Sequence, residues 1–142
     1  MFVSECLNVN NNGNLTIGGV DTTELAHEFG TPLYVLDEQT IRNNCRQFKK
    51  SLEKNYKNSQ VIYASKALNC LEMCRIINSE GLGLDVVSGG EIFTALKVGF
   101  PAERIFFHGN NKTYDELEMA IEKGIGRIII DNPFEMATIN EI

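Results

Sequence analysis

The chain has 142 residues, 43% of them hydrophobic, which suffices for one ordinary core but not for two well-developed domains. A formal charge of -6 with scattered basic residues disfavours nucleic acid as a partner, because such a field repels phosphate backbones. No basic and apolar leader opens the sequence, and no apolar run approaches the ~20 residues needed to cross a bilayer. We therefore expect a cytoplasmic protein with no membrane partner.

Turn signals dominate the first thirty residues. Residues 8–14 are rich in asparagine and lack periodicity, which indicates a loop or hairpin tip before a short strand at 15–17. Asp21 then stands at the N-cap of a short helix, in the pattern of a capping box, and Gly30 ends that helix. Residues 33–36 are predicted to form a strand.

A long helix is predicted after Asp37, which is placed to cap it. Apolar residues recur on one face at the spacing of an amphipathic helix: Ile41, Cys45, Phe48 and Leu52. The pattern predicts that the helix packs through this face.

The four cysteines, Cys6, Cys45, Cys70 and Cys74, lack the paired close spacings of a zinc site. Only two histidines are available to complete one, so we expect no metal site. We expect buried or half-buried thiols in a reducing compartment. Metal binding or a redox pair is the alternative, and Cys70 and Cys74 lie one helical turn apart.

From residue 61 onward the sequence repeats one pattern, a short apolar strand that ends in a polar residue and leads into a helix. The strands are predicted within residues 61–64, 84–88, 105–108 and 128–131. The alternation favours a parallel sheet with right-handed crossovers, and strands apolar throughout are expected when both faces are covered. The predicted fold class is α/β, a partial (β/α)8 TIM barrel of about four βα units after a short N-terminal β/α segment. An open doubly wound sheet is the alternative, although no Gly-x-Gly-x-x-Gly fingerprint supports nucleotide binding.

Helix starts after these strands are well marked. Residues 88–91 and 113–116 fit the capping box, and Pro133 stands at a first helical position. The side chains of Ser88 and Glu91 are therefore interpreted as structural. The two glycines between them either bind an anion through backbone N–H groups or permit close packing.

Polar residues at the carboxyl ends of the four strands are predicted to converge on one rim. They are Lys66, Asp85, His108 and Asp131, at separations of 19, 23 and 23 residues. Desolvation and neighbouring groups free the amine of a lysine in such a place, so Lys66 is a candidate Schiff-base former. The alternative is a lysine that merely lies in a loop after a strand.

Each of the other rim residues also has two interpretations. Asp85 either orients Lys66 or a cofactor, or accepts local backbone hydrogen bonds. His108 either contacts a flat cofactor or bonds to a neighbouring carbonyl group. Asp131 either joins the rim or serves only the turn before the next helix.

Three motifs together resemble the diaminopimelate decarboxylase family. They are Tyr63-Ala64-Ser65-Lys66-Ala67, Gly-Leu-Asp-Val-Val-Ser-Gly-Gly-Glu at 83–91, and Ile-Phe-Phe-His-Gly-Asn-Asn-Lys at 105–112. The resemblance implies an alanine-racemase-like fold, in which an eight-unit (β/α) barrel carries the cofactor and a separate β domain completes the site. It assigns residues 1–30 to an N-terminal segment that packs with the β domain, and residues 31–142 to the first half of the barrel.

The same resemblance implies a site and a reaction. Lys66 is the catalytic lysine and binds pyridoxal 5'-phosphate, with Ala64, Asp85 and His108 as further cofactor contacts. The substrate is an amino acid, meso-2,6-diaminopimelate, which a homodimeric or larger enzyme of lysine biosynthesis decarboxylates to L-lysine and CO2. Decarboxylases of ornithine or arginine share the barrel and are the alternative, although residues 88–91 and 108–112 favour diaminopimelate.

The family's glycine-rich phosphate loop and its acidic partner for the pyridine nitrogen are expected to lie beyond residue 142. We therefore expect this chain alone to be inactive. A further alternative is a non-catalytic half-barrel that self-associates through unpaired sheet edges.

Overall fold

The computed structural model describes residues 4–142 and divides the chain into two compact units, Met1–Asn44 and Cys45–Ile142. The boundary falls within the long helix α2 (Glu38–Asn55). All the buried hydrophobic side chains among the described residues belong to the second unit. The expected single hydrophobic core is therefore found among the described residues, but the chain forms two compact units where its length predicts one.

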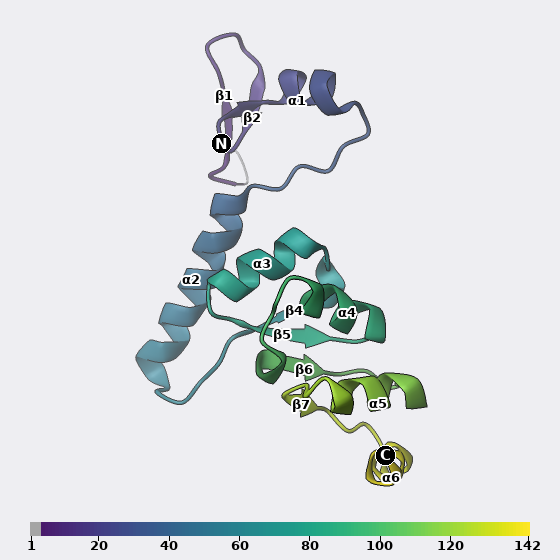
Figure 1. Cartoon of the computed structure of the whole chain (residues 1–142). Coiled ribbons are helices and arrows are strands. Elements are labelled where there is room, and N and C mark those ends of the chain that lie inside the picture. Colours follow the sequence, from purple (N-terminus) through teal and green to yellow (C-terminus); the bar gives the residue numbers. More distant parts are fainter. Residues whose placement is uncertain (1–3) are drawn as a thin grey trace. The chain divides into compact units, whose positions relative to one another are not determined.

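The first unit contains a three-stranded antiparallel sheet and one short helix (Figure 1). The sheet order is β1 (Leu7–Val9), β2 (Leu15–Ile17) and β3 (Val20–Asp21), and α1 (Thr22–Phe29) follows. Asp21 caps α1 as predicted, because its side chain accepts a hydrogen bond from the backbone N–H of Thr23 at 2.8 Å. The same carboxylate accepts from the amides of Asn10 and Asn14, at 2.7 and 2.9 Å, and so fixes the predicted hairpin tip to the helix start.

The predicted strand at residues 33–36 is absent from the structure. The segment has no partner strand among the described residues, and the side chain of Tyr34 is 99% exposed. An apolar run becomes a strand only when a neighbour supplies the ladder of hydrogen bonds, and none does so here.

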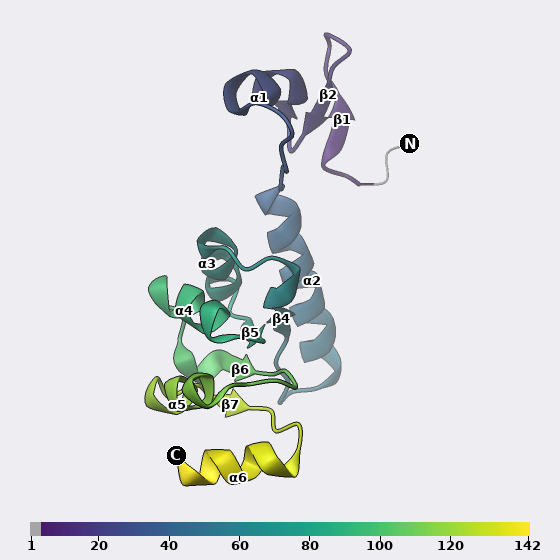
Figure 2. The same cartoon turned by 90° about the vertical axis from the view of Figure 1, so that its right-hand side faces the viewer.

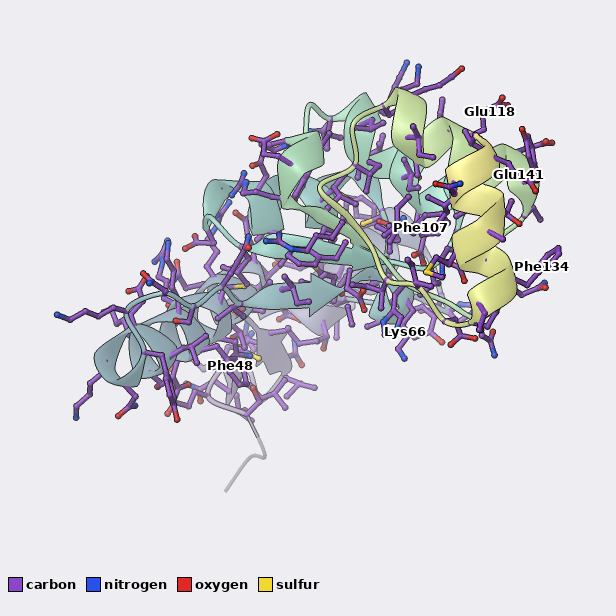
Figure 3. All side chains as sticks on the ribbon, turned by 90° about the horizontal axis from the view of Figure 1, so that it is seen from below. Phe48, Lys66, Phe107, Glu118, Phe134 and Glu141 are labelled. Atoms are coloured by element: carbon purple, nitrogen blue, oxygen red, sulfur yellow. The ribbon has the colours of Figure 1, made fainter. Side chains whose placement is uncertain are left out.

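Helix α2 begins where it is predicted to begin, but fewer residues of its apolar face are buried than predicted. Asp37 accepts a hydrogen bond from the backbone N–H of Thr40 at 2.7 Å. Cys45 is buried, whereas the side chain of Phe48 is 70% exposed (Figure 3). The prediction that Phe48 packs inward with Cys45 is therefore wrong.

The second unit is a four-stranded parallel sheet in the order β4-β5-β6-β7, with a helix after each strand. The strands are β4 (Ile62–Ala64), β5 (Gly83–Val86), β6 (Ile105–Phe107) and β7 (Arg127–Ile128). The helices are α3 (Leu71–Ser79), α4 (Gly89–Lys97), α5 (Tyr114–Glu122) and α6 (Pro133–Glu141), with 3-10 helices η1 (Ser65–Ala67) and η2 (Ala102–Arg104). This confirms the predicted series of βα units.

Helices α3, α4 and α5 lie side by side along one face of this sheet (Figures 1 and 2). The side chains that the sheet buries against them are 0% exposed: Leu84, Val86, Ile105 and Phe107. Alternate residues of the strands point to the other face, where Asp85 and Phe106 are only half-buried. The prediction that both faces are covered is therefore wrong for the described residues, and the second face is open to carry polar groups.

None of the helices described between residues 4 and 142 has the length and apolarity that crossing a bilayer requires.

Candidate functional site

Lys66 lies in η1, directly after the carboxyl end of β4. Its side chain is exposed, and Figure 3 shows it beyond the end of the sheet toward which the strands run. The preceding residue, Ser65, is 0% exposed. The backbone at Lys66 is therefore anchored while its amine is accessible.

Strand register places Ala64 beside Asp85, and β5 contacts the η1 turn that carries Lys66. Ala64 of β4 is the parallel partner of Asp85 of β5, and Lys66 follows Ala64 by two residues. Because paired residues of adjacent strands point to the same face, Asp85 lies on the open face beside a small methyl side chain. Its side chain is 19% exposed.

His108 lies next to Asp85 on the neighbouring strand. The Nδ1 atom of His108 is 3.6 Å from Oδ1 of Asp85, and the imidazole side chain is 56% exposed. The backbone N–H of His108 donates to the carbonyl of Val86 at 2.8 Å, which continues the ladder between β5 and β6. The structure therefore brings two of the predicted site residues together directly.

Asp131 does not join this pair. Strand β7 ends at Ile128, and the side chain of Asp131 is exposed. Its backbone N–H donates to Oε2 of Glu135 at 3.3 Å, so the residue belongs to the turn that leads into α6. The second of the two interpretations of Asp131 is the one that the structure supports.

The interpretation of Glu91 as half of a capping box is wrong in one respect. Ser88 does accept from the backbone N–H of Glu91, at 3.3 Å. The Glu91 carboxylate, however, does not return to Ser88: its Oε2 accepts from the hydroxyl of Ser65 and from the N–H of Val87, both at 2.7 Å. Glu91 therefore reaches the turn that presents Lys66.

The predicted anion site at the start of α4 is already filled by the protein. Oε1 of Glu116 accepts from the backbone N–H of Gly89 at 2.7 Å, and the rest of that side chain packs against the glycine. Burial alone would raise the pKa of the Glu116 carboxyl, but hydrogen bonds from Gly89 and Thr113 and the nearby charge of Lys112 lower it below its ordinary value. The carboxylate is thus held ionised at this helix entrance.

Lys112 and Glu135 form a buried ion pair that was not predicted from the sequence. Nζ of Lys112 lies 2.7 Å from Oε1 of Glu135, and the two side chains are 1% and 6% exposed. The same ammonium donates to the carbonyls of Gly109 and Ile129. The signal that could have found it is a third N-cap residue followed three positions later by glutamate, at Asn132 and Glu135.

Of the four cysteines, none of which forms a disulfide with another described residue, Cys45 and Cys74 are buried and Cys6 is half-buried. Cys70 is exposed, contrary to expectation. Burial raises the pKa of the Cys74 thiol. Among residues 4–142 no three histidine, cysteine or acidic side chains are grouped so that they could hold a metal ion.

A cavity of about 370 Å³ lies between α5 and α6 and is lined also by residues of the loop before α5. Lys112, Tyr114, Phe134 and Glu135 are among its lining residues, and Lys66, Asp85 and His108 are not. The candidate site is therefore the open carboxyl end of the sheet at β4, β5 and β6, and not this cavity.

Comparison with known proteins matches residues 38–142 to the family described as pyridoxal-dependent decarboxylase, pyridoxal binding domain. Over all 142 residues the chain is 51% identical to a diaminopimelate decarboxylase of Bacillus methanolicus and 49% identical to one of Bacillus subtilis, of which it covers 33% and 32%. A solved diaminopimelate decarboxylase of M. jannaschii in complex with L-lysine superimposes with a TM-score of 0.88 at 36% identity, over 99% of this chain and 33% of that one. The chain thus spans about a third of the length of the curated relatives it matches.

Proposed function

We propose, from the premise that this chain belongs to the family of pyridoxal-dependent decarboxylases, that Lys66 is the residue that binds the cofactor. The observation that carries the proposal is an exposed primary amine directly after β4, at the same end of the sheet as the carboxylate of Asp85 on β5 and the imidazole of His108 after β6. The active-site residues of a parallel (β/α) sheet lie at this end, because the loops that follow the strands meet there.

The described residues fit pyridoxal phosphate. The aldehyde of that cofactor requires an accessible amine, which Lys66 offers. The small side chain of Ala64 leaves the open face beside Asp85 free for a flat ring. When bound, the cofactor supplies an electron sink for the bond that breaks in decarboxylation.

The chain's own residues have distinct roles in this proposal. Lys66 holds the aldehyde carbon, and Ala64, Asp85 and His108 line the space next to it. The Asp85 carboxylate lies 3.6 Å from Nδ1 of His108, so the two polar side chains are neighbours at this end of the sheet.

For the whole protein we propose decarboxylation of meso-2,6-diaminopimelate to L-lysine and CO2, in the cytoplasm. Support comes from the relatives named above, which are diaminopimelate decarboxylases at 51% and 49% identity. We also propose that residues 1–30 pack with a β domain and that 31–142 form the first half of the barrel. Decarboxylation of ornithine or arginine is the alternative for the same site.

Self-association is proposed as a second property of this chain. Strands β4 and β7 form the two edges of the parallel sheet, and the side chains next to these edges include exposed Ile62, Ile129 and Ile130. Apolar surface beside an unpaired strand edge favours association between copies. Sedimentation equilibrium should give dimers or larger species, and a monodisperse monomer would contradict this.

Absorption spectroscopy tests the role of Lys66. The chain is titrated with pyridoxal phosphate, and the band of the lysine adduct is recorded for the parent, for Lys66→Ala and for Lys97→Ala. Lys97 is an exposed lysine on α4 and serves as the matched control. We expect Lys66→Ala to lose the band and Lys97→Ala to keep it. Equal bands in all three would mean that any surface lysine reacts, and the assignment would be wrong.

A further inference from the structure

The helices α4, α5 and α6 begin with the same arrangement. In each, an N-cap side chain accepts from the backbone N–H three residues later, and that later residue is a glutamate: Ser88 with Glu91, Thr113 with Glu116, Asn132 with Glu135. A negative side chain in the first turn is favourable, because the helix start carries a partial positive charge. The arrangement therefore stabilises the start of each of the three helices.

Each of these glutamates also binds the entrance to its own helix. The carboxylates accept from the backbone N–H groups of Val87 at 2.7 Å, Thr113 at 3.0 Å and Asp131 at 3.3 Å. For α5 this donor is the N-cap residue itself, and for the other two it is the residue before the N-cap. The glutamates thus fold back toward the carboxyl end of the sheet.

The same carboxylates reach one βα unit further back along the chain. Their partners there are the Ser65 hydroxyl for Glu91, the Gly89 N–H for Glu116 and the Lys112 ammonium for Glu135, each at 2.7 Å. Every glutamate therefore fastens its own turn to the preceding one. We call these three residues the glutamate clasps. Helix α3 has none, because Met73 occupies the corresponding position and Cys70 provides no side-chain cap.

The first glutamate clasp lies at the candidate site. Ser65 is 0% exposed, directly precedes Lys66, and has no side-chain cap on η1 to hold it. One oxygen atom of Glu91 accepts from both Ser65 and Val87, so it joins the turn after β4 to the turn after β5. Hydrogen bonds to an ionised carboxylate are roughly twice as strong as neutral ones.

We propose that Glu91 is a positioning residue for Lys66. It holds the Ser65 turn against β5 and thereby directs the Lys66 amine toward the side of the sheet where Asp85 and His108 meet. The inference rests on the proposed role of Lys66. The inference adds Glu91 to the site as a residue that acts on Lys66 only through its hydrogen bonds with the Ser65 hydroxyl and the Val87 N–H.

The test compares two glutamate clasps of the same kind. Glu91→Ala removes the clasp at Lys66, and Glu116→Ala removes the equivalent clasp one unit further on. Two quantities are measured for the full chain: amide hydrogen exchange of the segment 62–68, and the rate at which the borohydride-reducible adduct of Lys66 with pyridoxal phosphate forms. Ser65→Ala is the third variant, since it deletes one hydroxyl and decides the question if Glu91→Ala does not fold.

We expect Ser65→Ala to accelerate exchange in this segment and to slow adduct formation, each by about tenfold, the effect of losing one charge-assisted hydrogen bond. Glu91→Ala loses two such bonds and should change both quantities at least as much. Glu116→Ala should change both quantities much less, because it loosens the start of α4 but leaves both hydrogen bonds of Glu91 in place. Equal effects of Glu91→Ala and Glu116→Ala on the segment, or no effect of Ser65→Ala, would overturn the inference. If the parent forms no Lys66 adduct, the proposed function fails, and the exchange comparison still decides whether Glu91 positions the turn.

Discussion

Oδ1 of Asp85 lies 3.6 Å from Nδ1 of His108, across the adjacent parallel strands β5 and β6. The pair is more than a hydrogen-bond length apart and the imidazole is 56% exposed, so its contribution to folding is small, below about 1 kcal/mol. His108→Ala should therefore leave the thermal midpoint nearly unchanged while weakening pyridoxal phosphate binding by about tenfold, as expected for one lost polar contact. Calorimetric unfolding and a binding titration measure the two effects. A variant that unfolds early but binds normally would show that His108 is structural.

Lys112 and Glu135 form a buried ion pair whose removal should destabilise the chain strongly. Lys112→Met leaves the Glu135 carboxylate buried without its cation, which typically costs about 3–5 kcal/mol. The control is Arg75→Met, which breaks the exposed pair with Glu72 and should cost less than about 1 kcal/mol. Urea unfolding of the three proteins measures the difference, and similar losses for both variants would contradict this account.

The hydrogen bonds to Glu116 give a pH-dependent contribution to stability. Because the folded-state pKa of this carboxyl lies below its ordinary value of 4.5, the contribution is present above that value and is lost as pH falls through the folded pKa. Glu116→Gln should be less stable than the parent at pH 7, by about 1 kcal/mol after allowance for solvent screening. Denaturation curves between pH 7 and about pH 3 should show the difference shrinking as the pH is lowered. A constant difference over that range would exclude the carboxylate as its source.

Gly89 and Gly90 are neighbours at the start of α4 but differ in surroundings. A Cβ atom on Gly90 meets only Ser88 Oγ, at 3.8 Å, so Gly90→Ala should stabilise the helix by about 0.5 kcal/mol. A Cβ atom on Gly89 would lie 3.2 Å from Cγ of Glu116 and would disturb the glutamate clasp. Gly89→Ala should therefore be neutral or destabilising. Thermal unfolding compares the two variants, and a larger gain for Gly89→Ala would contradict the packing described.

Thiol labelling should distinguish Cys70, the N-cap residue of α3, from Cys74 within that helix. Cys70 is exposed, whereas Cys74 is 1% exposed and burial raises its thiol pKa. The reactive thiolate is therefore scarcer and less accessible at Cys74. A maleimide reagent at neutral pH should modify Cys70 first, as peptide mass spectrometry would show. Labelling of Cys74 at an equal rate would mean that α3 opens readily.

The order of strands and helices was predictable from the sequence, because each apolar run of the second unit is followed by a marked helix start. Ser88 and Thr113 cap their helices as the capping-box pattern indicates. The segment 33–36 was not predictable in this way, since whether an apolar run pairs depends on a neighbour and not on its own residues. The burial of the second sheet face, with Asp85 and Phe106, was overestimated for the same reason, because it also depends on which neighbours cover the strands.

The candidate site was predictable only in part. Strand ends placed Lys66, Asp85 and His108 at one end of the sheet, and register then brought Asp85 beside His108. The partners of Glu91 could not be predicted from the sequence. Ser65 lies 26 residues away, and its hydroxyl group meets Glu91 only because the turns after β4 and β5 are neighbours in the fold. Local spacing indicates a cap, but it does not say which neighbouring unit the carboxylate also binds.

Mapping the adduct after borohydride reduction tests the central claim most directly. The chain is incubated with pyridoxal phosphate, reduced and digested, and the pyridoxyl group is located by mass spectrometry. Lys66, exposed after β4 at the end of the sheet that also carries Asp85 and His108, should carry most of the label. A label spread evenly over the exposed lysines, with no excess on the peptide that contains Lys66, would contradict the account.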